Sequence, residues 1–142
     1  MMPFQFDMSD PDQAHTAGRL RSATILWLAS VRSNGQPHLV PVWFLWEGET
    51  ILIFSKPENQ KVRNIRQNPA VTVSLDETDE GDDVIVLEGA AELDGDPGVT
   101  TALPAYAAKY GGQIADLGWT PETMAREYSQ PIRITITRKM NV

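Results

Sequence analysis

Runs of apolar residues, separated by turn-forming residues, predict that the chain is mainly β. The runs at residues 24–31 and 37–46 flank Asn34-Gly35, and this pair is the strongest short-range signal for a β-hairpin. The isoleucines at 132, 134 and 136 alternate with polar residues, as in a strand that buries one face. Further strands are expected at residues 50–55, 70–75, 84–93 and 131–138. These six strands predict an antiparallel β-barrel or a strongly curved sheet.

Helix signals lie between these strands. Asp10-Pro11 places a capping residue before a first-turn proline, which predicts an N-terminal helix within residues 1–20. The stretch 98–128 has helical spacing but is interrupted, so one helix is expected to end at Gly111 and another to begin at Thr120-Pro121. We therefore expect a helical excursion before the last strand.

The second strand, residues 37–46, is apolar on both faces. Such a strand packs against the core on one side and against a partner subunit or a planar ligand on the other, or it is buried on both sides in a tightly packed barrel. Pro41 cannot donate a backbone hydrogen bond, which predicts an edge or a bulge and leaves neighbouring backbone groups free to face a ligand. The pattern alone leaves these alternatives open.

Charge is distributed unevenly along the chain. Its 142 residues include 19 acidic and 12 basic side chains, which gives a formal net charge of −7. Such a protein repels polyanions, so neither nucleic acid nor an anionic membrane surface is an expected partner. The acids concentrate in residues 76–83, whereas Glu58 is the single acid among the bases of residues 56–66. A local cationic patch therefore remains on an acidic protein.

The basic segment has the form of a phosphate-binding helix N-terminus. Within residues 56–66, Val62 and Ile65 lie three residues apart, which predicts a short helix that ends at Asn68-Pro69. The first turn of a helix presents unpaired N–H groups and a partial positive charge, and both favour a phosphate. The side chains that can join them are Ser55, Lys56, Gln60 and Lys61. The glycines of nucleotide-binding loops are missing, and the alternative is a solvated basic helix face.

Several enzyme classes are excluded by residues that the chain lacks. With no cysteine there is no disulfide, thiolate nucleophile or cysteine-ligated metal. His15 and His38 have no serine or carboxylate at a motif spacing, and the acidic loop departs from a calcium loop at Thr78 and Leu87. No metal site and no catalytic residue are therefore assigned. Without a signal peptide or an apolar run of membrane length, we expect one domain, residues 1–142, in the cytoplasm.

The order of these features resembles the pyridoxamine 5′-phosphate oxidase-like split-barrel superfamily. The segments that carry the resemblance, in order and spacing, are residues 28–44, 54–55 and 60–69. The segments that resemble the branch of probable coenzyme F420-dependent oxidoreductases are residues 86–92, 109–110 and 131–135. Together the likeness extends from about Leu20 to Arg138.

The resemblance implies a six-stranded antiparallel split β-barrel of the FMN-binding type, with short peripheral helices. It also implies a homodimer with two equivalent cofactor sites at the subunit interface. The residues expected around the cofactor phosphate are Ser55, Lys56, Gln60, Lys61 and Arg63, with Lys61 as the main anchor. The residues whose backbone is expected along the flavin-like ring are Val40, Pro41, Val42 and Trp43. Asn64 is expected to join the helix to a strand.

The activity implied by the resemblance is F420-dependent hydride transfer to a small conjugated substrate. The cofactor carries this chemistry, so the protein needs a dry slot, a fixed orientation and a phosphate anchor, but no nucleophile or metal. Two alternatives stay open. One is an FMN-binding oxidoreductase of the same fold, because a phosphate grip and backbone contacts to a ring suit either cofactor. The other is a cofactor-binding dimer without turnover.

Overall fold

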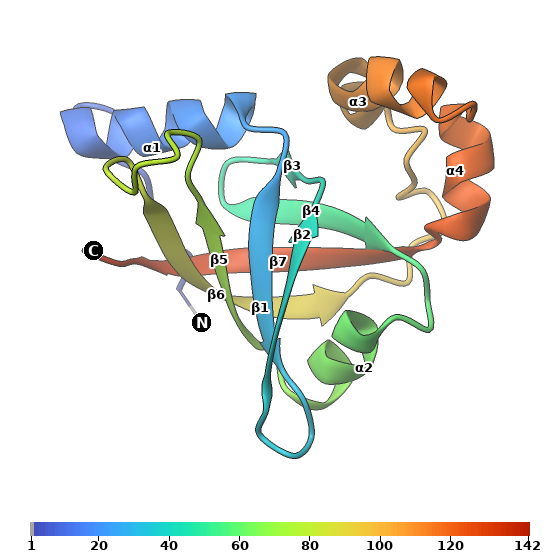
Figure 1. The fold of residues 1–142 in the computed structure, drawn as a ribbon, viewed down its shortest axis with the longest axis horizontal. Helices are drawn as coiled ribbons and strands as arrows, with labels where there is room; N and C mark the ends of the chain where they lie inside the picture. Colours follow the sequence, from blue (N-terminus) through green and yellow to red (C-terminus); the bar gives the residue numbers. More distant parts are fainter. Residues whose placement is uncertain (1) are drawn as a thin grey trace.

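The computed structural model describes residues 2–142 and contains one strongly curled antiparallel sheet with four helices around it (Figure 1). In chain order the elements are α1 (Pro11–Ser22), β1 (Leu26–Val31), β2 (Pro37–Val42), β3 (Leu45–Trp46), β4 (Thr50–Ser55), α2 (Gln60–Gln67), β5 (Ala70–Leu75), β6 (Ile85–Leu93), α3 (Pro104–Asp116), α4 (Pro121–Glu127) and β7 (Gln130–Lys139). The strand order in the sheet is β2-β1-β5-β6-β7-β4-β3.

The sheet has seven strands, and the expectation of six was wrong. The expected strand 37–46 is divided, because β2 pairs with β1 whereas β3 pairs with β4 at the opposite edge of the sheet. Trp43 and Phe44 carry the chain from one edge to the other. The sheet is therefore a half-barrel whose two edges are joined by consecutive residues, as in a split barrel. Pro41 lies in the edge strand β2, as its missing N–H predicted.

The main core fills the inside of the curl. The three alternating isoleucines of β7, at 132, 134 and 136, are fully buried, which confirms the predicted one-sided strand. They meet apolar side chains from β1, β2, β4, β5 and β6, together with Leu20 of α1 and Val62 and Ile65 of α2. The hydrophobic effect on these buried faces holds α1 and α2 against the barrel.

The helices follow the predicted positions with one correction. α1 and α4 begin at Pro11 and Pro121, each behind a capping side chain, and α2 ends before Pro69 as expected. The predicted end at Gly111 was wrong, because α3 continues to Asp116. Its buried residues Tyr106, Tyr110 and Ile114 recur every four residues. Their packing outweighs the cost of about 1 kcal/mol that each glycine imposes in a helix.

α3 and α4 form an arm on one side of the barrel, with α1 on the other side (Figure 1). The arm has an apolar cluster of its own, separate from the main core. This cluster contains Tyr106, Tyr110, Ile114 and Met124 of the arm, which pack against Leu52 and Phe54 of β4. The helical excursion is thus a second packing unit attached to the edge of the barrel.

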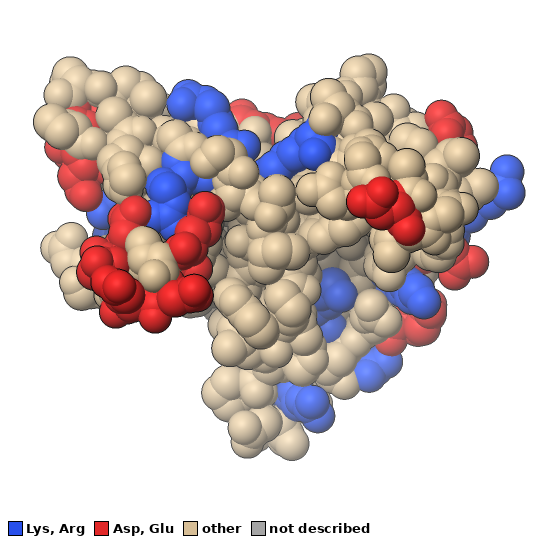
Figure 2. Space-filling view, turned by 45° about the horizontal axis from the view of Figure 1, so that its top comes forward, with Lys and Arg blue, Asp and Glu red and all other residues tan. Residues whose placement is uncertain are grey.

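The acidic loop 76–83 packs over α1 rather than forming an ion site. Asp83 accepts hydrogen bonds from Arg19 and contacts the His15 ring at 2.9 Å. Figure 2 shows the acidic side chains gathered at the corner of the molecule beside α1. Among residues 2–142 no group of three or more metal-binding side chains comes together. None of the helices in this part of the chain has the length and the apolar character of a membrane span.

Candidate functional site

A cavity of about 540 Å³ lies between the barrel and the arm. Its lining residues are Ile25, Pro41, Val42, Trp43, Phe54, Asn59, Lys61, Tyr106, Leu117, Trp119, Met124 and Tyr128. The volume is in the range of small-molecule binding sites, and the lining is mostly apolar with a few polar groups, as such sites are. Four of the nine predicted cofactor-binding residues line it: Pro41, Val42, Trp43 and Lys61.

The barrel wall of the cavity is formed where the chain leaves β2. Trp43 stacks on Tyr110 with ring centroids 4.7 Å apart and planes 2° from parallel. The Tyr110 hydroxyl accepts a hydrogen bond from the Phe44 N–H at 2.9 Å, and it lies within hydrogen-bond distance of the carbonyls of Thr24 and Phe44. Lys109 Nζ donates to the same Phe44 carbonyl at 2.9 Å. Helix α3 therefore fixes the ring of Trp43 and the backbone of Phe44, the two residues that join one edge of the sheet to the other.

The polar end of the cavity is the start of α2. Lys61 lies in the first turn of this helix, and the side chain of Asn59, the residue before the helix, makes no capping hydrogen bond. Partial burial lowers the pKa of Lys61 below its ordinary value. The ion pairs formed by the described residues do not include Lys61. A cation without a carboxylate partner and the open N–H groups of a helix start thus meet at one place, which suits an anion.

The predicted cofactor-binding residues that do not line the cavity make contacts within the protein. Ser55 is fully buried, and its hydroxyl donates to the carbonyl of Lys56 at 2.9 Å. Lys56 lies over the ring of Tyr128, with Nζ 5.7 Å from the ring centroid. Arg63 donates to Gln60 Oε1 and to the carbonyl of Glu58, both at 2.6 Å. Val40 packs against the main core rather than lining the cavity.

A chain of polar contacts anchors α2 to the barrel. Gln60 Nε2 donates to Asn64 Oδ1 at 2.7 Å, and Asn64 Nδ2 donates to Ser30 Oγ of β1 at 2.9 Å. Asn64 and Ser30 are both buried, so this bond has a large effect on the geometry of the helix. The expectation that Asn64 joins the helix to a strand is confirmed. Gln60 and Asn64 thereby hold in place the helix turn that carries Lys61.

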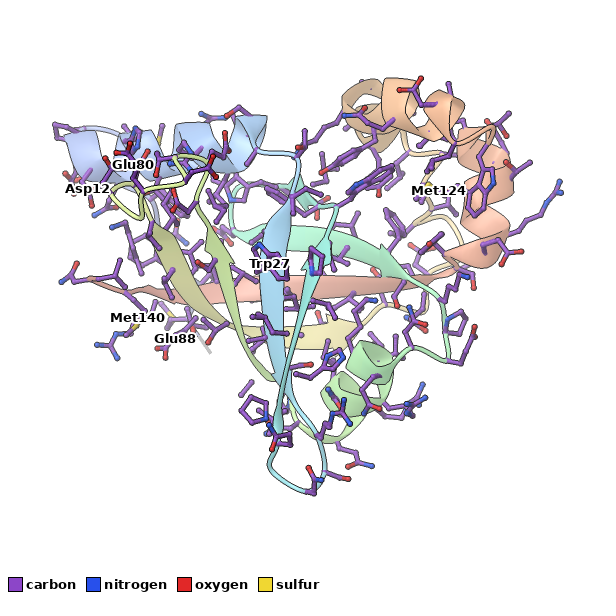
Figure 3. All side chains as sticks on the ribbon, in the orientation of Figure 1. Asp12, Trp27, Glu80, Glu88, Met124 and Met140 are labelled. Carbon is purple, nitrogen blue, oxygen red and sulfur yellow. The ribbon has the colours of Figure 1, made fainter. Side chains whose placement is uncertain are left out.

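The arm, residues 98–128, supplies a wall of the cavity in its own chain, with lining residues that the sequence had not assigned to a site. Its residues are Tyr106, Leu117, Trp119, Met124 and Tyr128. Met124 lies on the side of α4 that faces the barrel (Figure 3). Aromatic residues four apart at 106 and 110 indicate a buried helix face, but this spacing does not say which surface the helix covers. Burial raises the pKa of Tyr110 to about 12 and raises that of Tyr106 further, so both stay protonated.

An exposed apolar strip continues from the cavity onto the outer face of the sheet. Trp27 lies opposite Pro41 in the β1–β2 register, and Ala29 lies opposite Leu39, so these side chains share one face. Trp27 and Leu39 are 46% and 60% exposed, which is unusual for large apolar residues on neighbouring strands. Figure 3 shows Trp27 on β1. Ile25, which is also exposed, and Pro41 belong to both the strip and the cavity.

The family follows from a comparison of the sequence with known families. A family described as "Pyridoxamine 5'-phosphate oxidase" matches residues 12–139. The chain belongs to the pyridoxamine 5′-phosphate oxidase family. The match spans every strand of the half-barrel and confirms the resemblance found in the sequence. A search of curated proteins found no match.

Solved structures with the fold of this family have diverse roles. A conserved hypothetical protein of Mycobacterium tuberculosis has 24% identity and a TM-score of 0.74, over 98% of this chain and 87% of that one. A structure described as an F420 reductase has 26% identity and a TM-score of 0.64, over 87% of this chain and 94% of that one. HutZ of Vibrio cholerae, a haem storage protein, has 12% identity and a TM-score of 0.62, over 95% of this chain and 92% of that one. Membership of the fold does not by itself fix an activity.

Proposed function

We propose that this protein is an F420-dependent oxidoreductase that transfers a hydride to a small conjugated substrate in the cavity between the barrel and the arm. The observation that carries the proposal is the combination of Lys61, a cation without an acidic partner at a helix start, with flat apolar walls in one cavity. A phosphate-bearing ring cofactor has the same two parts. Its phosphate would lie at Lys61 and its ring along Pro41, Val42 and Trp43.

The chain's own residues have binding and positioning roles in this proposal. Lys61 and the first N–H groups of α2 hold the anionic end of the cofactor. Tyr110 and Lys109 fix the side chain of Trp43 and the backbone of Phe44. The ring of the cofactor would therefore pack against residues that are held in place. The apolar lining excludes water from the reacting atoms. When bound, the cofactor supplies the two-electron chemistry, which needs no protein nucleophile.

FMN is the second candidate cofactor. It offers the same phosphate and a similar ring, so the cavity suits it as well. F420 is favoured by the likeness to an F420 reductase and by its anionic oligoglutamate tail, which would profit from further bases. Lys56, Arg63 and Arg66 lie on or just before α2, and they are candidates to hold that tail.

In this proposal a second copy of the chain covers the exposed apolar strip. Trp27 and Leu39 would be buried by it, which removes apolar surface from water. Because Ile25 and Pro41 belong to both the strip and the cavity, a copy seated there would also close the open side of the cavity. The proposed active form is therefore a homodimer with a cofactor site at each end of the interface.

Titration of the purified protein with F420 and with FMN, followed by ring fluorescence, tests the cofactor assignment. We expect micromolar or tighter binding of one of them, and Lys61→Ala should weaken it by about 10- to 100-fold, the usual effect of losing a hydrogen bond to a charged group. Arg126→Ala is the charge-matched control, because Arg126 is exposed on α4 and does not line the cavity. If neither cofactor binds, the redox proposal fails. Equal cofactor binding by wild type and Lys61→Ala would exclude only the role of Lys61 as the phosphate anchor.

A turnover measurement distinguishes an enzyme from a dimer that only binds the cofactor. Single-turnover oxidation of reduced F420 by a panel of enones and quinones should proceed only when the protein and an accepted substrate are both present. Tight cofactor binding without such oxidation would instead assign a storage or carrier role.

A further inference from the structure

His38 has a ring nitrogen that is buried without a partner. The residue lies in β2, and alternation along the strand places it on the same face as Val40 and Val42, which pack in the main core. Its Nδ1 is buried and makes no hydrogen bond with any other group of residues 2–142. Such an atom is uncommon in a folded protein and calls for an explanation.

Contacts through β1 place His38 at the end of the barrel that α2 covers. His38 lies opposite Ser30 in the β1–β2 register, and the buried Ser30 hydroxyl accepts a hydrogen bond from Asn64 of α2 at 2.9 Å. Lys61 precedes Asn64 by three residues, so the two side chains lie on the same side of the helix. The ring of His38 and the start of α2 with Lys61 therefore belong to one region of the molecule.

The charged groups that act on His38 are all cations. Burial lowers the pKa of His38, and Arg32, which follows β1, and Lys61 of α2 lower it further. β1, β2 and α2 contain no acidic residue, and the other bases of α2, Arg63 and Arg66, are exposed. At neutral pH His38 is therefore an uncharged ring beside two cations.

An anion at the start of α2 would reverse this balance. Its negative charge offsets the repulsion between the two cations and a protonated ring, so it favours the charged form of His38. The coupling is reciprocal: if the anion makes the proton bind more tightly, the proton makes the anion bind more tightly by the same factor.

We propose that His38 takes up a proton when an anion binds beside Lys61, so that a fall in pH tightens the binding of that anion. The inference rests on the proposed function, because the anion at Lys61 would be the phosphate of the cofactor. His38 is not among the residues that line the cavity, so it acts on the anion through its charge and not by contact with the cofactor ring. Loading of the site then depends on pH.

NMR titration of the histidine rings tests this coupling on the full chain without cofactor. The chain has two histidines, His15 and His38, so their ring signals can be followed separately. Sulfate is the probe, because its charge does not change over the pH range of the titration. We expect about 50 mM sulfate to raise the titration midpoint of His38 by about half to one pH unit relative to chloride at the same ionic strength. The signal of His15 should not respond to sulfate, because Asp83 already lies 2.9 Å from its ring.

Two variants decide whether the response belongs to this pair of residues. Lys61→Ala should abolish the difference between sulfate and chloride at His38. His38→Gln should bind sulfate equally well on both sides of the wild-type His38 midpoint, as measured from the amide signals of α2. Wild type and His15→Gln, the matched change at the other histidine, should bind sulfate about 3- to 10-fold more tightly on the acid side. Equal His38 midpoints in sulfate and chloride would overturn the inference, as would a sulfate response that persists in Lys61→Ala.

Cofactor titrations of the same proteins separate this inference from the proposed function. If F420 or FMN binds but sulfate leaves the His38 midpoint unchanged, the proton coupling alone fails. If neither cofactor binds but sulfate raises the midpoint in a way that requires Lys61, the coupled anion site stands and the oxidoreductase proposal fails.

Discussion

At the scale of single residues, the carbonyl oxygen of Phe44 accepts contacts from two side chains of α3. It lies 2.9 Å from both the Lys109 ammonium and the Tyr110 hydroxyl, and the ammonium also lies 3.9 Å from the centroid of the Phe44 ring. A cation over an aromatic face is attracted by the ring electrons, and a charge-assisted hydrogen bond is stronger than a neutral one. Two neighbouring side chains of α3 thus hold one point of the backbone.

Burial of Lys109 predicts a dependence of stability on pH. Burial lowers its pKa from the ordinary 10.5 to about 8. Between these values the unfolded chain keeps a proton that the folded chain has released, so the free energy of unfolding rises with pH. Burial raises the pKa of Tyr110 to about 12, which has the opposite effect at pH values where free tyrosine ionises. The window for the measurement is therefore about pH 8 to 9.5.

Urea unfolding of wild type and Lys109→Met at several pH values in this window measures the effect. The wild-type free energy of unfolding should rise more steeply than that of the variant. Lys61 contributes a rise of the same sign in both proteins, because its pKa is also lowered, and the difference between the two curves isolates Lys109. Parallel curves would contradict the burial of this ammonium in the folded protein.

At the scale of elements, the pairing of β6 with β7 depends on a close approach at Gly89. The register shifts between Glu88 and Gly89, and a Cβ at Gly89 would lie 2.6 Å from the carbonyl oxygen of Thr135 and 2.7 Å from a methyl of Ile134. Backbone of the partner strand cannot yield as a flexible side chain would. This bulge therefore needs a residue without a side chain.

Gly89→Ala should lower the free energy of unfolding by about 1–3 kcal/mol, the usual cost of overpacking. The measurement is the urea midpoint at constant slope. Gly95→Ala is the control, because a Cβ there meets no atom within 4 Å and the backbone angle is an ordinary one. Equal midpoints for the two variants would mean that the strands separate at little cost.

The elements also show how far sequence reasoning reaches. Local signals placed the β1–β2 hairpin, the isoleucine face of β7 and the start of α4, because each depends on residues adjacent in the chain. The break at Trp43 and Phe44 has no local signal, since it follows from the curl of the whole sheet. The end of α3 was misplaced for a similar reason, because Ile114 continues the helix by packing in a cluster that a propensity scale does not include.

The candidate site was predicted only in part for the same physical reason. Lys61 and the stretch from Pro41 to Trp43 line the cavity, and they were predicted as cofactor contacts because they lie in segments whose order resembles the family. The sequence indicated a helical stretch at residues 98–128 but could not place it against the site or assign Tyr106 and Trp119 to it. Its place over the barrel depends on contacts between residues more than fifty positions apart, such as Tyr110 with Phe44. Arg63 and Gln60 stay predicted cofactor contacts, and in the structure the Arg63 guanidinium donates a hydrogen bond to Gln60 Oε1.

At the scale of the whole molecule, the exposed apolar strip predicts self-association. Leu39→Glu places a charge at the end of the strip away from the cavity, so the lining of the cavity is unaltered. Sedimentation velocity at micromolar concentration should show a dimer for wild type and a monomer for the variant, and the monomer should bind the cofactor more weakly. Met8→Glu is the control, because Met8 is also half exposed but lies outside the strip. A wild-type monomer would contradict the proposed assembly.

The separate apolar cluster of the arm has a consequence for how this protein can diversify. Stability of the barrel depends on the main core, whereas the shape of the arm side of the cavity depends on residues such as Leu117, which is 61% exposed. Substitutions at such positions can therefore accumulate without threatening folding, and selection can act on ligand preference while the scaffold stays constant. Variation confined to such exposed positions leaves the contacts of Tyr110 and Lys109 with Phe44 unchanged.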